Sequence, residues 1–149
     1  MKKKINQAFL LTLSLLLAGT VFNSFTKVVG GEGYRIFVNN KLIAERFGDE
    51  MKNVLTITLT ELKATDEISI RYFHCGQAGK KRHLSLRDEQ KHVLKQWYFT
   101  DENYADASMS CPLKEIISTK RSNASGELYL YYASDELPAG RLLATIKTS

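Results

Sequence analysis

The histidine and cysteine side chains are the first candidates for a functional site in this chain, because both bind transition metals. His74 is followed directly by Cys75, a second cysteine is Cys111, and His83 lies nine residues after His74. Thiolate and imidazole ligands together favour copper or zinc. One hypothesis is therefore a periplasmic metal-binding or redox protein that uses His74, Cys75 and Cys111, with His83 as a further ligand.

The spacing of these residues favours a simpler interpretation. A blue-copper site of the sandwich type needs cysteine, histidine and methionine close together in one loop, whereas no histidine follows Cys111. His83 and His92 fall on different expected strands or turns. We therefore expect all three histidines to be polar or hydrogen-bonded surface groups, and we expect no bound metal or cofactor.

A second candidate is the basic loop over residues 76–83, in which Lys80, Lys81 and Arg82 follow two glycines. Backbone amides that glycines leave accessible, with cations beside them, can bind a phosphate, a sulfate or a uronate. A nucleotide phosphate loop is excluded, because it requires Gly-x-x-x-x-Gly-Lys-Ser/Thr before a helix. The loop predicts either an anion or acidic-glycan contact, or an ordinary solvated turn.

Tyr129 and Tyr131 form a third candidate. Alternation over residues 128–132 puts these two rings on one face of a strand and three apolar or aromatic residues on the other. Exposed aromatic rows can stack on sugar rings or dock a partner. Cross-strand packing alone also explains tyrosines in a strand.

Signatures of catalysis are missing from the sequence. It contains neither Gly-x-Ser-x-Gly nor His-Glu-x-x-His, and paired carboxylates such as Asp88 with Glu89 fall in expected turns. We therefore expect a protein without enzymatic activity.

The N-terminus has the pattern of an export signal. Basic residues over 2–4 precede an apolar stretch over 8–18, which is shorter than the roughly 20 residues that a membrane-spanning helix needs. We expect a signal peptide over residues 1–24, a mature domain over residues 25–149 and no membrane span after cleavage. The expected location is the periplasm or the cell exterior, and an exported chain with two cysteines predicts a Cys75–Cys111 disulfide.

Period-two alternation dominates the mature chain and predicts an all-β fold. Seven or eight short strands are expected, at residues 34–38, 42–47, 54–60, 67–73, 83–87, 93–100, 127–133 and 141–147. The irregular stretch over 101–117 could contain a helical turn at 105–109 and a strand at 113–117. We expect a single antiparallel β-sandwich of immunoglobulin-like architecture, with Trp97 in the core beside the disulfide.

Charge removes most of the support for one class of partner. The 149-residue chain has a formal net charge of +5, but removal of residues 1–24 leaves 18 basic against 16 acidic residues, a net charge of +2. Nucleic-acid binding needs a clustered basic face, so we expect no nucleic acid.

Several segments resemble a family of small exported proteins of Gram-negative bacteria that has no assigned activity. The resemblance rests on His74-Cys75-Gly76, on Met109-Ser110-Cys111 and on the ending at residues 130–141. It implies an exported protein with a disulfide, and it implies no catalytic residue. Together these observations predict an exported interaction domain that binds an unknown protein or glycan of the cell envelope.

Overall fold

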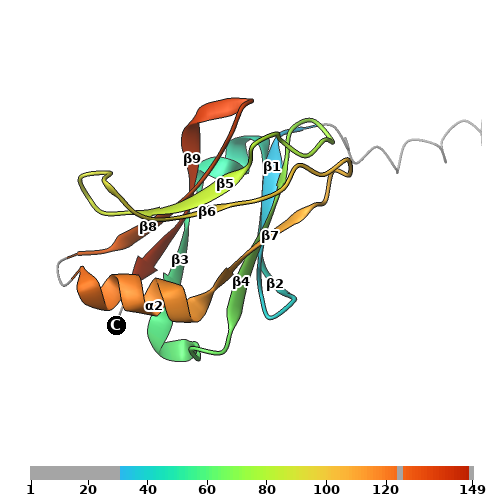
Figure 1. The fold of residues 1–149 in the computed structure, drawn as a ribbon. Coiled ribbons are helices and arrows are strands. Elements are labelled where there is room, and N and C mark those ends of the chain that lie inside the picture. Colours follow the sequence, from blue (N-terminus) through green and yellow to red (C-terminus); the bar gives the residue numbers. More distant parts are fainter. Residues whose placement is uncertain (1–30, 124–125, 148–149) are drawn as a thin grey trace, which may run out of the picture.

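The computed structural model describes residues 31–123 and 126–147, which fold mostly into strands arranged as two sheets (Figure 1). The expected signal peptide lies outside the described residues. The first sheet, sheet A, has the order β2 (Lys41–Phe47), β1 (Gly33–Val38), β4 (Glu67–Phe73), β7 (Ser108–Pro112). The second, sheet B, has the order β3 (Leu55–Thr58), β9 (Leu137–Lys147), β8 (Leu128–Ser134), β5 (His83–Arg87), β6 (Val93–Tyr98).

In β4 and β5 the alternation of apolar residues correctly predicts the buried face, whereas in β6 the expected inward residue Val93 is exposed. Ile68 and Ile70 of β4 and Leu84 and Leu86 of β5 are all fully buried, as period-two burial requires. Side chains of both sheets meet in one hydrophobic core. Removing their apolar surface from water is the main favourable contribution to folding.

The prediction of a wholly antiparallel arrangement is wrong at one edge. β3 pairs in parallel with β9, with Leu55 opposite Ala144. The direction of β9 is already determined by its antiparallel pairing with β8. β3 therefore joins the edge of sheet B as a short parallel strand of four residues between two 3-10 helices, η1 (Gly48–Lys52) and η2 (Leu59–Glu61).

The irregular stretch after β6 also differs from expectation. Residues 108–112 form β7 rather than the end of a helical turn, and the expected strand at 113–117 is the start of a helix, α2 (Leu113–Ser122). Pro112 suits the helix start because its φ is fixed and no intrahelical partner is needed for its nitrogen. Leu113 and Ile116, three residues apart, are buried on one face of α2. No helix in the described ranges is long and apolar enough to cross a membrane.

Trp97 lies at the border of the core and is only partly buried, so its expected central position is wrong. Its indole Nε1–H donates a hydrogen bond to Glu115 Oε2 at 2.9 Å, and Lys95 Nζ forms an ion pair with the same carboxylate oxygen at 2.9 Å. Trp97 therefore joins β6 to α2, and its side chain is not next to a disulfide.

The structure contradicts the predicted disulfide. Cys111 lies opposite Ile68 at the start of β4 and donates its thiol to the carbonyl oxygen of Ile68 at 3.5 Å. Cys75 lies in an exposed turn beyond the other end of the same strand. Five extended residues of β4, roughly 17 Å, separate Ile68 from Phe73, and Cys75 follows in the turn beyond it, whereas a disulfide needs Cα atoms within about 7 Å. Both thiols are free.

We predict that the two thiols react at very different rates in the native protein. Burial raises the pKa of Cys111 to about 12, and only the thiolate is nucleophilic. A thiol reagent at neutral pH should modify Cys75 quickly and Cys111 only after unfolding. Denatured, unreduced protein should release two thiols, and a reducing agent should leave the melting temperature unchanged. A drop in melting temperature on reduction would contradict the assignment.

Candidate functional site

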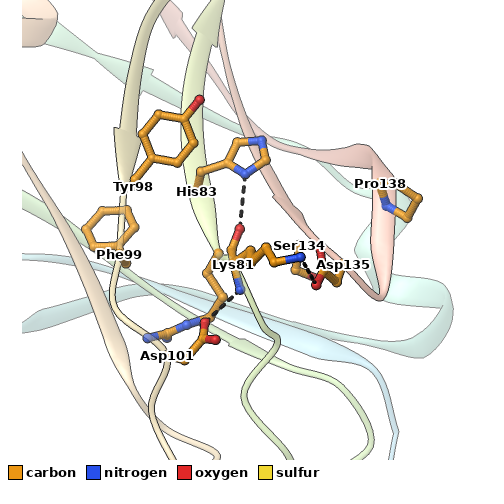
Figure 2. A pocket seen from close by; sticks show the side chains of 9 residues that line it. Lys81, His83, Tyr98, Phe99, Asp101, Ser134, Asp135 and Pro138 are labelled. Carbon is orange, nitrogen blue, oxygen red and sulfur yellow. Dashed lines mark hydrogen bonds and ion pairs between the residues drawn. The ribbon is translucent and has the colours of Figure 1, made fainter.

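A cleft of about 630 Å³ lies at one end of sheet B, where β5 and β6 meet the β8–β9 turn (Figure 2). Its walls are aromatic, charged and small polar side chains in close proximity. They are Lys81, Arg82, His83, Tyr98, Phe99, Asp101, Ser134, Asp135 and Pro138.

The aromatic side of the cleft is formed by Tyr98 and His83. These residues face each other across the β5–β6 ladder, with ring centroids 5.5 Å apart. Their neighbours Trp97 and Leu84 point to the inner face, so alternation directs Tyr98 and His83 outward. Tyr98 is 75% exposed. An exposed ring beside polar groups suits a ligand with both apolar and hydrogen-bonding surfaces.

Lys81 lies in the middle of the cleft and is held at both ends. Its backbone N–H donates to Asp101 Oδ1 at 2.7 Å, and its Nζ lies 3.0 Å from Asp135 Oδ2 (Figure 2). The hydrogen bond and the charge of Asp135 raise the pKa of Lys81 above its usual value. The Lys81 backbone has φ +50°, a conformation uncommon for residues other than glycine.

The basic loop binds carboxylates of its own chain. The backbone N–H of Lys80 donates to both carboxylate oxygens of Glu136, at 3.2 and 3.0 Å. Although burial acts in the opposite direction, this hydrogen bonding lowers the pKa of Glu136. The amides of Lys80 and Lys81 are therefore used by Glu136 and Asp101. The anion or acidic-glycan contact of this loop stays a prediction, and carboxylates of the same chain already occupy these two amides.

Arg82 contradicts its predicted role as an exposed anion contact. Its side chain is 1% exposed, and its guanidinium donates to the carbonyl oxygens of Ala107 at 3.1 Å and Thr100 at 2.7 Å. Arg82 lies two residues before Leu84, so alternation directs its side chain to the same inward face as that of Leu84. The Arg82 guanidinium therefore joins the start of β5 to the irregular segment before β7. It is inaccessible to a polymer bound at the surface.

Tyr129 and Tyr131 lie on the outer face of sheet B, as alternation predicts, and both are half-buried. Arg87 on β5 places its guanidinium 4.3 Å from the centre of the Tyr131 ring, and the Tyr129 hydroxyl donates to Glu127 at 3.4 Å. One face of the Tyr131 ring is therefore covered by Arg87 of the same domain, and neither tyrosine ring lines the cleft.

A buried aromatic cluster lies beneath the cleft and joins the two sheets. Tyr72 of β4 stacks on Tyr132 of β8, with centroids 4.1 Å apart and planes 12° apart. His74 Nε2 lies 2.9 Å from the Tyr132 hydroxyl and 3.2 Å from Ser134 Oγ. Burial raises the pKa of Tyr132 to about 12. Because Ser134 also lines the cleft, the cluster and the cleft share a wall.

Charged groups complete the cluster at Tyr72. Its hydroxyl donates to Glu32 and accepts from Arg141 Nε at 3.0 Å, and Arg141 forms an ion pair with Glu32 at 3.2 Å. Burial, together with the hydrogen bond to Glu32, raises the pKa of Tyr72 well above its usual range. Tyr72 is therefore a neutral structural hydrogen-bonding group at physiological pH.

The residues of the metal or redox hypothesis are not brought together. His74 faces the inner cluster, His83 faces outward beside Tyr98, and Cys111 lies buried at the far end of β4. Within residues 31–123 and 126–147, no group of three or more His, Cys, Asp or Glu side chains could hold a metal ion.

Sequence reasoning missed most of the residues that form the cleft. Lys81, Arg82 and His83 were candidates, but Tyr98, Asp101 and Asp135 were not. The sequence signal for Tyr98 was the alternation in β6. Trp97 faces inward, so Tyr98, the next residue, faces outward. Asp101 and Asp135 follow different strands, and only the sheet order brings their loops together.

Comparison of the chain with protein-family models, with curated proteins and with solved structures finds no match.

We predict that Gly79→Ala destabilises the fold, because an added Cβ would clash with three side chains. A Cβ at Gly79 would lie closest to the Tyr132 hydroxyl, and 2.9 Å from both His74 Nε2 and Glu136 Oε2. Overpacking of this kind costs about 1–3 kcal/mol of unfolding free energy, measurable by urea denaturation. Tyr132→Phe removes the nearest atom, so Gly79→Ala should cost less in that background. An equal cost in both backgrounds would place the clash elsewhere.

We predict that His74 makes stability depend on pH. Burial, aided by the charge of Arg141, lowers the pKa of His74 below its usual 6.5, while Glu136 and Glu32 oppose the shift. The unfolded chain therefore binds a proton first as pH falls through about 6.5, and stability decreases until the lowered native pKa is passed. His74→Gln should flatten this part of the stability–pH curve. An unchanged slope would show that His74 does not cause it.

Proposed function

We propose that the protein is an exported, non-enzymatic interaction domain that recognises a protein or glycan of the cell envelope through the cleft at Tyr98. The observation that carries the proposal is a highly exposed aromatic ring at the mouth of a cleft that also offers a lysine and two carboxylates. Binding sites commonly combine apolar or aromatic walls with a few placed polar groups.

The architecture we propose is an immunoglobulin-like β-sandwich. Its support is that two sheets contribute to one core and that tyrosines from both sheets stack on each other. Such folds serve many functions, so the fold alone does not identify a ligand. The cleft supports the binding role more directly, because the loop beside it and the Lys81 side chain already have partners within the chain.

Preorganisation of the cleft favours recognition. Lys81 is fixed by Asp101 and Asp135, and the adjacent loop is fixed by Glu136. Groups that are already ordered lose less conformational entropy when they bind. The same groups provide donors and acceptors for hydroxyls or for a peptide backbone, while Tyr98 provides a stacking surface.

The proposed location follows from the expected signal peptide over residues 1–24 and from the resemblance to small exported proteins. An exported domain meets the polysaccharides and proteins of the envelope rather than cytoplasmic metabolites. Envelope components are therefore the ligands to test first.

We predict that Tyr98→Ala abolishes or strongly weakens binding. The mature domain, immobilised, would be challenged with purified envelope polysaccharide and, separately, with solubilised envelope proteins. Loss of a central aromatic contact should reduce affinity by about ten-fold or more. Chemical-shift changes in the ¹⁵N-labelled domain should centre on Tyr98 and His83.

The matched control is Tyr104→Ala, since Tyr104 is also an exposed ring but does not line the cleft. It should bind as the parent does. If both variants lose binding equally, or if shift changes centre on another surface, the cleft is not the binding site.

A further inference from the structure

The exposed lysine and aspartates of the cleft carry a negative charge on balance. Lys81, Asp101 and Asp135 are exposed, whereas Arg82 is buried and donates to two backbone carbonyl oxygens. One exposed ammonium therefore accompanies two exposed carboxylates. The Lys81 amide is also occupied, because Asp101 accepts from it at 2.7 Å. A phosphate, a sulfate or a uronate would meet like charge at this surface and would have to displace a carboxylate from the amide.

The same charged groups retain hydrogen-bonding capacity that suits hydroxyls. Asp101 bonds the Lys81 amide through Oδ1, and Asp135 pairs with Lys81 Nζ through Oδ2 at 3.0 Å. The second oxygen of each carboxylate has no hydrogen bond within residues 31–123 and 126–147. A hydroxyl can donate to a carboxylate and accept from an ammonium at the same time. Such charge-assisted hydrogen bonds are about twice as strong as neutral ones.

Apolar walls lie on two sides of these polar groups. Figure 2 shows Tyr98 and Phe99 on the β6 side of the cleft, Pro138 on the β9 side, and Lys81 between them. A pyranose ring has the same division of surfaces, because its C–H groups form apolar faces and its hydroxyls lie around the rim. An apolar face of the sugar can pack on an aromatic ring while the hydroxyls reach polar partners.

The size and lining of the cleft favour a sugar unit over a folded protein. Its volume of about 630 Å³ lies within the range of roughly 300–1,000 Å³ for sites that bind small ligands. A stable protein interface instead buries about 800 Å² on each partner and has several apolar anchors at its centre. Of the large apolar side chains that are exposed in the described part of the chain, only Tyr98 lines the cleft.

We propose that the cleft binds neutral sugar units of an envelope glycan, with a pyranose ring packed on Tyr98 and its hydroxyls hydrogen-bonded to Lys81, Asp101 and Asp135. The inference rests on the proposed function, because it names the ligand class of the same cleft. It replaces the acidic glycan that three successive cations in the sequence suggest. One of these cations, Arg82, is buried, and Lys81 is paired with Asp135.

Matched neutral and acidic oligosaccharides test the ligand class. The probes are oligomers of glucose, galactose, mannose and N-acetylglucosamine, each as the neutral form and after oxidation of C6 to a carboxylate. Titrated into the ¹⁵N-labelled mature domain at up to about 10 mM, at least one neutral probe should shift the amide signals of Tyr98 and His83. Its oxidised form should bind about five-fold more weakly or worse, because of repulsion by the two aspartates. Salt should leave the neutral affinity unchanged, because no ion pair with the ligand is screened.

Asp135→Asn has opposite effects on the two kinds of ligand. It should weaken neutral binding by about five-fold or more, because a charged acceptor becomes a neutral one. An acidic ligand would instead bind more tightly, because a repelling charge is removed and Lys81 loses its partner. Asp49→Asn is the matched control, since Asp49 is also an exposed aspartate paired with a lysine, Lys52, and does not line the cleft. It should bind as the parent does, and circular dichroism confirms that both variants are folded.

The outcomes separate this inference from the proposed function. Tighter binding of the oxidised probes, no binding of any neutral probe, or neutral binding that Asp135→Asn leaves unchanged overturns the inference. If Tyr98→Ala still weakens binding of an acidic probe or of an envelope protein, the cleft remains the binding site and only the ligand class is wrong. If Tyr98→Ala weakens no interaction with any probe or envelope component, the proposed function fails as well.

Discussion

The stacking of Tyr72 on Tyr132 is the interaction that joins the two sheets at the end of the molecule where the cleft forms. Tyr34 extends the stack on the side of sheet A, and its hydroxyl donates to the carbonyl oxygen of Leu143 in β9 at 3.3 Å. All three rings are fully buried. Buried hydroxyls need hydrogen-bond partners, because an unsatisfied one costs about 1–3 kcal/mol. This requirement brings Glu32, His74 and Arg141 to the same place from distant parts of the sequence.

The loops around the cleft are arranged by a related constraint. Turns with positive φ, as at Lys81, expose backbone amides that would otherwise bind water or an anion. Here Glu136 and Asp101 occupy those amides, and Asp135 pairs with the Lys81 side chain. Ionic contacts between exposed groups contribute little individually to stability. Their main consequence is geometric, because together they fix the cleft side chains relative to the sheet.

The amount of structure that could be read from the sequence differed between strands and loops. Strands 67–73 and 83–87 were predicted with the bounds observed, because burial on one face imposes a period of two on the residue types. α2 was missed because its ten residues have only two buried positions, Leu113 and Ile116, and no strong helical period. The disulfide was predicted from cysteine count and location, which contain no information about distance.

Arg82 shows why the candidate site was harder to predict than the fold. In sequence it is the third of three successive cations, a pattern typical of exposed loops. Its parity with Leu84 and Leu86, however, places it on the inward face, and parity determines its burial. Asp101 and Asp135, which border the cleft, come from the loops after β6 and β8, and no local pattern reports that these loops meet.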